Sequence, residues 1–300
     1  MSSSDVRSLA IQTVIYQNDP AEIIRAVHAV AQSTQNAVSD GFIAMGWKVL
    51  LGDCSPTPTF SAKTIHSLEV ELNSRGGELE YTYFDANLGS AEGHNRLSAL
   101  ADSETILILN PDAQAAPDCI SFLAQSLIEG VGSVEARQIP IEHPKYYDAV
   151  SRETSWSSTA CLLTSRDAYS TVGGFDAKTF FLYCDDVDYS WALRLMGLRV
   201  LYEPAATVFH DKRLNIRGEW PTSEAEEYYS AEAALLLAYK YSRNDLLETL
   251  LTDFATQSSA SRKALKEFRR REKAGVLPAR VDSKHAVATF VSGNYTTHRF

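Results

Sequence analysis

Three carboxylates follow an aromatic run near the middle of the chain, in Phe180-Phe181-Leu182-Tyr183-Cys184-Asp185-Asp186-Val187-Asp188. Clustered acids beside apolar residues cost free energy unless they meet a cation, water or hydrogen-bond donors. Apolar residues recur at helical spacing over Tyr189–Leu198, which predicts a helix directly after the acids. The cluster therefore indicates a chemical site, with Arg194 and Arg199 as expected partners of the acids. The alternative is that the acids only complement the dipole of that helix.

Two other polar segments are placed to bind a ligand. Thr105–Leu109 is a strongly apolar predicted strand, and Asn110-Pro111-Asp112 follows it directly. Open α/β sheets bind ligands at this carboxyl end of their strands. The segment Asn87–Asn95 contains two glycines and leads into a predicted helix, Arg96–Ala101. The backbone N–H groups of such a turn suit an anion, and a plain helix-entry turn explains the segment equally well.

The elements that must position these residues alternate between strands and helices. Asp19-Pro20 has the pattern of a helix start, and Thr64–Leu72 is a further predicted helix. Such alternation predicts an α/β fold with a mainly parallel sheet flanked by helices. Arg137–Pro144 is expected to be irregular, and Glu203-Pro204 to form a turn between two short strands. The predicted strands are Leu9–Tyr16, Trp47–Leu51, Glu80–Phe84, Thr105–Leu109, Ser155–Thr164, Val200–Tyr202 and Thr207–Phe209.

The character of the chain changes after about Arg213, where long helices are predicted at Ser223–Tyr241 and Asp245–Ala255. We therefore expect residues 1–213 to form the α/β domain and residues 214–300 a mainly helical C-terminal region. Arg262–Lys273 contains seven Lys or Arg and two Glu, a net charge of +5, so the rest of the chain carries −15. A solvated helix is the favoured interpretation of this segment, and contact with anionic lipid headgroups is the alternative.

The composition excludes several classes of protein. The chain of 300 residues has 45% hydrophobic and 22% charged residues, which is typical of a soluble globular protein. Its net charge of −10 argues against a general nucleic-acid binder. Its four cysteines lack CxxC spacing, as expected of free thiols in a reducing compartment. Without a secretory signal or an apolar run of roughly 18–20 residues, we expect a cytoplasmic protein. Peripheral contact with the inner face of the cell membrane and a homo-oligomer both stay open.

Taken in order, these motifs resemble the inverting family 2 glycosyltransferases with a GT-A fold, particularly the rhamnosyltransferase-like and galactofuranosyltransferase-like members. The resemblance covers roughly residues 9–212, and its acidic block is the most specific part. The matching residues are Tyr16, Asp53-Cys54-Ser55, Asn87-Leu88-Gly89 with Asn95, Asn110-Pro111-Asp112, Val172-Gly173-Gly174-Phe175-Asp176, Phe181-Leu182-Tyr183, Asp185-Asp186-Val187-Asp188 and His210. The chain departs from the family pattern at Ile15, Asn110, Thr159 and Asp185, where Thr, Asp, Gly and Glu are more usual.

The resemblance implies a metal-dependent transfer of sugar, with inversion, from a UDP- or dTDP-sugar to a hydroxyl of a growing polysaccharide or glycolipid. Asp186 matches the general base, and Asp185 is the like-charged neighbour that raises a pKa. Asp112 and His210 match ligands of a divalent cation, Mg²⁺ or Mn²⁺, on the donor diphosphate. A surface position is the alternative for His210. Asp188 is expected to orient Arg194 or the start of the helix.

The remaining implied roles concern the two substrates. Asp53 matches an acid that accepts from the N3–H of uracil or thymine, and a turn residue is the alternative. The resemblance also implies a donor site that includes Asn87, Gly89, Asn95 and Asn110. It implies an acceptor side, for a saccharide or a lipid-linked saccharide, at Trp156, Gly173 and Gly174. Core packing of Trp156 and a tight turn at the two glycines are the alternatives.

Two other functions compete with sugar transfer. A sugar-phosphate nucleotidyltransferase also binds nucleotides through metal-held phosphates, and it calls for a Gly-rich, Arg- or Lys-bearing segment near the first strand. The residues 16–20, Tyr-Gln-Asn-Asp-Pro, do not have that composition. A non-catalytic binding protein with the same fold would be expected to lack an acid among Asp112, Asp185 and Asp186, and all three are present.

Overall fold

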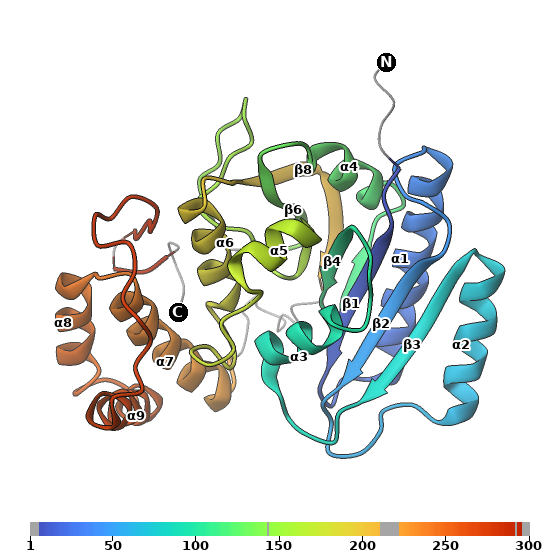
Figure 1. Ribbon diagram of the computed structural model, residues 1–300. Coiled ribbons are helices and arrows are strands. Elements are labelled where there is room, and N and C mark those ends of the chain that lie inside the picture. Colours follow the sequence, from blue (N-terminus) through green and yellow to red (C-terminus); the bar gives the residue numbers. More distant parts are fainter. Residues whose placement is uncertain (1–5, 143, 211–221, 292, 296–300) are drawn as a thin grey trace.

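In a computed structural model, which describes residues 6–142, 144–210, 222–291 and 293–295, the described residues build a mixed sheet of eight strands in the order β3-β2-β1-β4-β7-β6-β8-β5 (Figure 1). Strands β1 to β4 run parallel, β7 is antiparallel to both β4 and β6, and β5 pairs antiparallel with β8. The strands are β1 (Leu9–Ile15), β2 (Trp47–Asp53), β3 (Gly77–Tyr83), β4 (Thr105–Leu109), β5 (Ala113–Ala115), β6 (Val131–Ile139), β7 (Cys161–Ser165) and β8 (Arg199–His210).

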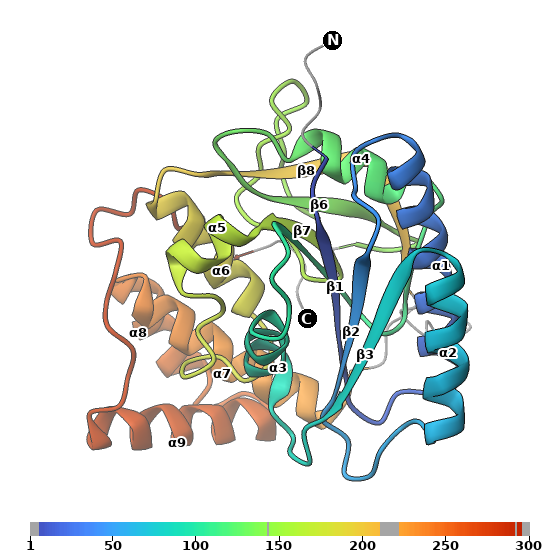
Figure 2. The same cartoon turned by 45° about the vertical axis from the view of Figure 1, so that its right-hand side comes forward.

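Helices cover both faces of this sheet (Figures 1 and 2). One face packs mainly against α1, α2 and α4, and its core includes Ile11, Val49 and Leu107. The other face packs against α3, α5 and α6, with Ile106 and Leu162 in its core. The helices are α1 (Pro20–Ser39), α2 (Ala62–Ser74), α3 (Gly89–Ser98), α4 (Cys119–Ser126), α5 (Arg166–Val172), α6 (Asp185–Leu195), α7 (Glu224–Lys240), α8 (Asn244–Asp253) and α9 (Ser259–Ala274).

The predicted α/β class with a mainly parallel sheet between helices is confirmed, and so is the helix start at Asp19, whose side chain accepts from the N–H of Ala21. Four local predictions were wrong. The strand predicted over Ser155–Thr164 begins only at Cys161. Residues 137–139 belong to β6 and are not irregular, because they pair with β8. Residues 199–210 form one strand, whose register with β6 shifts near Ala136 in place of the predicted turn. Helix α3 begins at Gly89, seven residues before the predicted start.

The C-terminal helices share a hydrophobic core with the sheet-bearing part of the chain. Trp156, Phe180 and Trp191 pack in one cluster with the buried leucines of α7 and with Phe268 of α9. Lys240, at the end of α7, forms ion pairs with Asp188 at 2.8 Å and with Asp176 at 2.7 Å. The helical region is thus packed onto the α/β part. The expected boundary at residues 213 and 214 lies outside the described residues.

The basic segment is a helix, α9, whose inner face contacts α7 through residues such as Ala264 and Phe268. Two of its arginines, Arg270 and Arg271, pair with Glu267 on the same helix. In the part of the chain that the structure describes, no helix combines the length and apolar character needed to span a membrane. The four cysteines are buried and free, as expected.

Candidate active site

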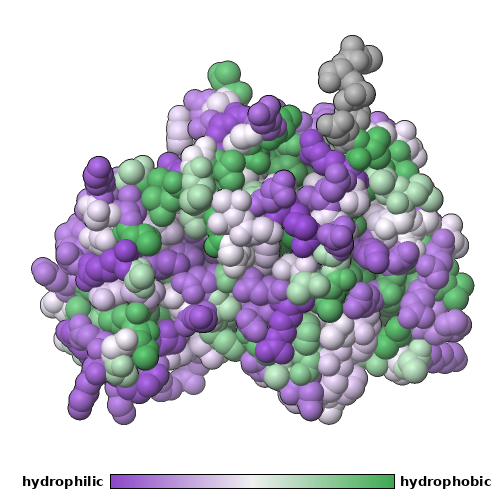
Figure 3. Space-filling view, in the orientation of Figure 1, coloured by the Kyte–Doolittle hydropathy of each residue, from purple (hydrophilic) through white to green (hydrophobic). Residues whose placement is uncertain are grey.

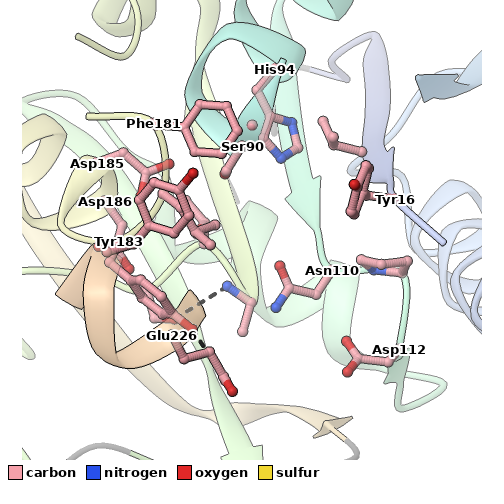
Figure 4. A pocket seen from close by; sticks show the side chains of 18 of the residues that line it. Tyr16, Ser90, His94, Asn110, Asp112, Phe181, Tyr183, Asp185, Asp186 and Glu226 are labelled. Atoms are coloured by element: carbon pink, nitrogen blue, oxygen red, sulfur yellow. Dashed lines mark hydrogen bonds between the residues drawn. The ribbon is translucent and has the colours of Figure 1, made fainter. Parts of the chain in front are cut away.

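A cavity of about 890 Å³ opens beside the carboxyl ends of β1 and β4 and brings together most of the residues singled out in the sequence. Figure 4 shows Asp185, Asp186, Tyr183 and Glu226 on one side and Asn110 and Asp112 on the other. The predicted site residues in its lining are Asn87, Gly89, Asn110, Asp112, Trp156, Asp185, Asp186 and His210. The acidic block and the residues after β4, about 75 positions apart in the sequence, therefore face one space.

The acidic side of the cavity is the first turn of α6, presented by a strained backbone. Tyr183 and Cys184 both have left-handed conformations, with φ of 65° and 58°. Such conformations cost of order 1–3 kcal/mol each for residues other than glycine, and they concentrate at functional sites. They turn the aromatic run sharply into the helix, so that Asp185 and Asp186 meet the cavity. One oxygen of Asp186 accepts from the N–H of Val187 at 2.8 Å.

Asp185 is the more buried carboxyl of the pair, with 4% of its surface exposed. Burial, and then the adjacent charge of Asp186, raise the pKa of Asp185 to about 7, although a hydrogen bond from the Ser90 side chain opposes the shift. Its Oδ2 atom has no hydrogen-bond partner among the described residues. At neutral pH Asp185 therefore exchanges a proton readily, and a carboxyl with such a pKa suits acid–base chemistry near pH 7.

The N-terminus of α3 meets the acidic side at close range. Gly89 has φ of 71°, and a Cβ atom there would lie 2.2 Å from the backbone oxygen of Phe181. The neighbouring Ser90 N–H donates to that same oxygen at 3.2 Å, and Asn87 accepts from the N–H of Gly89 at 3.3 Å. Only glycine permits this approach. The glycine of the predicted loop thus brings Ser90 to Asp185, which the sequence did not indicate.

The opposite side is built where β4 and β8 end. Ala113 pairs with His210 across β5 and β8, which places Asp112 next to the imidazole. The Nε2 atom of His210 lies 3.3 Å from Oδ1 of Asp112 and 3.2 Å from the amide nitrogen of Asn110. His210 has 6% of its surface exposed, so the surface alternative for this histidine was wrong.

The donor set on this side fits a divalent cation bound jointly with a substrate. An imidazole nitrogen and a carboxylate oxygen lie 3.3 Å apart and face one space, where a cation can bind both. Over the described ranges, no cluster of three or more His, Cys, Asp or Glu side chains is arranged to hold a metal. Mg²⁺ and Mn²⁺ sites commonly use one or two protein ligands together with phosphate oxygens and waters. Asp112 and His210 suit such a site.

The third wall comes from the C-terminal region, for which the sequence left the acceptor site, a subunit contact and a membrane contact open. Ser223, Glu226 and Tyr229 of α7 and its cap line the cavity. One Glu226 oxygen accepts from the Tyr183 hydroxyl at 3.2 Å, and the other accepts from the N–H of Ser223 at 2.7 Å, closing a capping box. The Tyr229 ring stacks near Phe181, with centroids 5.0 Å apart. The Ser-x-x-Glu spacing was a visible signal for the cap, but not for a place in the cavity.

Trp156 lines the cavity, yet 99% of its surface is buried, so core packing describes most of this residue and its contact with an acceptor stays a prediction. The Lys145 ammonium lies 4.2 Å from its ring centroid, and Tyr295 packs edge-on at 5.2 Å. Thr159 stands beside it in the lining. His94 of α3, which the sequence quoted without a role, also lines the cavity, and burial lowers its pKa to about 3, so it is neutral.

Four predicted site residues do not line the cavity. The Asp53 carboxylate accepts from the N–H groups of Ser55 and Thr59 at 2.9 and 2.7 Å and from the Tyr81 hydroxyl. These hydrogen bonds outweigh burial and lower its pKa, which fits the turn alternative. Asn95 binds both backbone groups of Phe175.

Gly173 and Gly174 are the other two residues outside the cavity. Gly173 is the left-handed C-cap of α5, and Gly174 packs against Asn95, so the tight-turn alternative describes them. The expected partners of the acids also differ. Asp188 pairs with Lys240, whereas Arg194 donates to backbone oxygens and Arg199 lies 3.8 Å from Glu153. Asp188 therefore does not orient Arg194, although this had been expected.

The sequence has identifiable relatives, although no family model matches it. It is 34% identical over 125 residues to the N-acetylglucosaminyl-diphospho-decaprenol L-rhamnosyltransferase of Mycobacterium tuberculosis, over 40% of each chain. It is 37% identical over 82 residues to the pre-mycofactocin glycosyltransferase of the same organism, over 27% of this chain and 16% of that protein. The alignments thus span well under half the length of these curated relatives.

Solved structures share the fold over nearly the whole chain. GalNAc-T7 with UDP, GalNAc and Mn²⁺ superposes with a TM-score of 0.65 and 11% identity, covering 90% of this chain and 55% of that one. The mannosyltransferase PcManGT from Pyrobaculum calidifontis, in complex with GDP-Man and Mn²⁺, superposes with a TM-score of 0.58 and 15% identity. This match covers 95% of this chain and 80% of that one. The chain therefore has the GT-A fold and is a relative of the glycosyltransferases, with a rhamnosyltransferase among its relatives, as its ordered motifs indicated.

Proposed function

We propose that the protein is a metal-dependent, inverting glycosyltransferase that moves a sugar from a nucleoside diphosphate sugar to a hydroxyl of a saccharide acceptor. One observation carries this proposal. The paired acids Asp185 and Asp186 and the cation-suited pair Asp112 and His210 line the same cavity from opposite elements. Sugar transfer needs both parts at once, because a base must take the acceptor proton while positive charge offsets the departing diphosphate.

In this mechanism Asp186 takes the proton from the acceptor hydroxyl as that oxygen bonds to the anomeric carbon. The bond from that carbon to the phosphate oxygen breaks, and its electron pair leaves with the diphosphate. Because attack and departure are in line, the anomeric configuration inverts. Asp185, with its pKa raised to about 7 by burial and by the charge of Asp186, keeps the pair poised between one and two negative charges. The hydrogen bond from Val187 fixes one Asp186 oxygen.

Asp112 and His210 would hold the cation, which when bound supplies Lewis-acid neutralisation of the diphosphate. The amide nitrogen of Asn110 lies 3.2 Å from Nε2 of His210. Asn110 therefore adds a hydrogen-bond donor beside Asp112 and His210 without adding a second negative charge. We propose a UDP- or dTDP-sugar as donor. The Asp53 carboxylate already accepts hydrogen bonds from Ser55, Thr59 and Tyr81, so a GDP-sugar belongs in the same screen.

We further propose that the acceptor is a saccharide, carried on a growing polysaccharide or a lipid, and that the product is a cell-surface glycan. The matched rhamnosyltransferase is named for a lipid-linked diphosphosugar acceptor. In this chain the aromatic side chains of Phe181, Tyr183 and Tyr229 offer flat apolar faces to sugar rings, and Glu226 offers a carboxylate to their hydroxyls.

The test is a calorimetric screen of UDP-, dTDP- and GDP-sugars with and without Mn²⁺ or Mg²⁺, followed by a transfer assay with the donor that binds. We expect one nucleotide class to bind more tightly with cation and to be consumed when a saccharide acceptor is added. A sugar-phosphate nucleotidyltransferase would instead form the nucleotide sugar from a sugar phosphate and a nucleoside triphosphate. A binding protein would hold the donor without turnover.

We also propose that α9 contacts anionic lipid headgroups. Its exposed Lys and Arg side chains form one stripe along the helix, at Arg262, Lys266, Arg269 and Lys273. The rest of the chain is strongly acidic. The surface over this end of the molecule is mainly hydrophilic (Figure 3), which suits headgroup contact without insertion. Helix α9 lies at the same end of the molecule as the carboxyl ends of β1 to β3 (Figures 1 and 2).

Co-sedimentation with vesicles of phosphatidylglycerol and phosphatidylcholine tests this contact. We expect binding to the anionic vesicles, none to pure phosphatidylcholine, and loss of binding at high salt, where charges are screened. Replacing three Lys or Arg residues of α9 by Gln should abolish binding to the vesicles. Replacing three exposed Lys or Arg residues elsewhere should leave that binding unchanged. The two sets are Arg262, Lys266 and Lys273, and Arg25, Lys63 and Lys178. Equal loss in both sets would refute a specific role of α9.

A further inference from the structure

A buried glutamine stands directly behind His210. Gln138, on β6, has 4% of its surface exposed, and its Oε1 atom lies 2.8 Å from Nδ1 of His210. The contact joins neighbouring strands, since Gln138 pairs with Val208 of β8. It is on the side of the imidazole away from Asp112, whose carboxylate faces Nε2. The two ring nitrogens of His210 thus meet different surroundings.

The orientation of the Gln138 amide follows from its other neighbour. Its nitrogen lies 3.4 Å from Oε1 of Glu135, and Glu135 forms an ion pair with Lys145 in which both side chains are almost fully buried. Burial raises the pKa of Glu135 to about 7, but the Lys145 ammonium opposes that shift, and a carboxylate paired with an ammonium accepts hydrogen bonds and does not donate them. The amide NH₂ must therefore face Glu135, and the amide oxygen must face His210. An amide oxygen can only accept, so Nδ1 of His210 carries the hydrogen.

The tautomer decides what His210 offers to the cavity. In a neutral imidazole with the proton on Nδ1, Nε2 presents a lone pair. The Asn110 amide nitrogen, 3.2 Å from Nε2, can donate to that lone pair. A cation between Nε2 and Asp112 requires the same state of the ring. Metal-binding histidines are commonly oriented in this way, by a partner that accepts from the other ring nitrogen.

We propose that Gln138 is a positioning residue, which sets the tautomer of His210 so that Nε2 is available to a divalent cation together with Asp112. The role rests on the proposed function, because that function supplies the cation. Glu135 and Lys145 act one step further back, since their ion pair fixes the Gln138 amide. The sequence carries no motif for Gln138, which lies 72 positions from its partner.

The first test reads the tautomer without any metal. Long-range ¹H–¹⁵N spectra of histidine-labelled protein distinguish Nδ1–H from Nε2–H, and the His210 signals are assigned from a His210→Asn variant. We expect Nδ1–H in the wild type. Gln138→Met has nearly the same volume but no acceptor, and it should give a mixture or Nε2–H. Gln114→Met on the neighbouring β5 is the matched control and should match the wild type.

The second test is calorimetry of MnCl₂ with UDP or dTDP present. Loss of such an orienting partner typically weakens metal binding about 10- to 100-fold, so Gln138→Met should bind Mn²⁺ that much more weakly. Gln114→Met should stay close to the wild type, which separates the acceptor role of Gln138 from a general effect of the Gln→Met change. Unchanged tautomer and unchanged affinity in Gln138→Met would overturn the inference. A wild type that shows Nδ1–H but binds no Mn²⁺ would instead overturn the cation role in the proposed function.

Discussion

At the scale of single residues, the account depends on two neighbouring acids with different surroundings. Asp185 is buried against Ser90, whereas Asp186 is the less buried of the two and lines the cavity with one oxygen held by Val187. The environment thus separates a carboxyl that keeps a proton to about pH 7 from one that can accept a proton during reaction. A carboxyl whose pKa is raised by burial and by a neighbouring charge is typical of acid–base sites.

Asp186→Asn should therefore lower the transfer rate by about 10²–10⁴-fold, since the amide cannot take the acceptor proton. Donor affinity should stay within roughly threefold of the wild type, because the cation side is untouched. Single-turnover kinetics and calorimetry with the same donor measure the two quantities. Full activity in this variant would refute the assignment of the base.

Asp185→Asn should change the pH dependence of stability. The folded-state pKa of Asp185, about 7, lies above its unfolded value of about 3.8, so the native state binds the extra proton between these values. Wild-type stability is consequently lost as pH rises through this window, and the Asn variant does not lose it. Between pH 4 and pH 8 the free energy of unfolding of the variant should rise, relative to that of the wild type, by on the order of 2–4 kcal/mol. Urea unfolding at several pH values measures this change. The control is Asp102→Asn at an exposed position, whose difference in unfolding free energy from the wild type should not follow this pH dependence.

The residues of the site were predictable where they belong to short motifs and unpredictable where they do not. Asp112, Asp185, Asp186 and His210 stand beside apolar runs, and such runs end at ligand-binding edges of sheets. Glu226 and Gln138 are single residues, placed by packing between elements distant in sequence, and nothing local marks them.

At the scale of elements, the site depends on the contact between the start of α3 and the turn before α6. This contact was hidden because the glycine-containing segment looked like a loop, whereas it is already helical from Gly89.

The strand β6 was not predicted for a related reason. Its pattern is broken by Glu135, Arg137 and Gln138, polar residues that are tolerated in a central strand because they meet Lys145, β8 and His210. Functional polar residues thus masked the strand.

Gly89→Ala should damage the site, since the new methyl group would collide with the Phe181 backbone oxygen at 2.2 Å on top of an unfavourable φ. We expect a loss of about 2–4 kcal/mol in unfolding free energy and a large fall in transfer rate as the acidic turn shifts. Gly173→Ala is the matched control, because it has a similar φ of 80° and nothing within 4 Å.

Gly173→Ala should lower the free energy of unfolding by only about 1 kcal/mol. It should leave the transfer rate and the acceptor KM unchanged. Chemical denaturation and steady-state kinetics compare the two variants. Equal effects of both substitutions would mean that φ alone matters and that the close approach of α3 does not. A raised acceptor KM in Gly173→Ala would restore the acceptor role predicted for that glycine.

At the scale of the whole molecule, the C-terminal helices complete the cavity and share a core with the α/β part. The sequence predicted the helices from their composition, but not the face they cover, because α7 is apolar around most of its circumference. The ion pairs of Lys240 with Asp176 and Asp188, the latter supported by the Tyr241 hydroxyl at 3.0 Å, tie the two parts together.

Lys240→Ala should destabilise the protein by about 3–5 kcal/mol, because it leaves the Asp188 carboxylate buried without its cation. Since Asp188 lies two residues from Asp186, the transfer rate should fall as well. Urea denaturation measures the stability, and the exposed Lys178→Ala is the control. A Lys240→Ala variant as stable as wild type would show that the C-terminal region is held by its hydrophobic core alone.

The most direct measurement of the central claim is a crystal structure of the protein soaked with Mn²⁺ and the nucleotide that binds, read by anomalous scattering from manganese. The account predicts one peak roughly 2.1 Å from Nε2 of His210 and from an Asp112 oxygen, in contact with the diphosphate, with Asp186 facing the sugar end of the nucleotide across the cavity. A manganese peak away from these two residues, or a nucleotide bound outside the cavity, would contradict it.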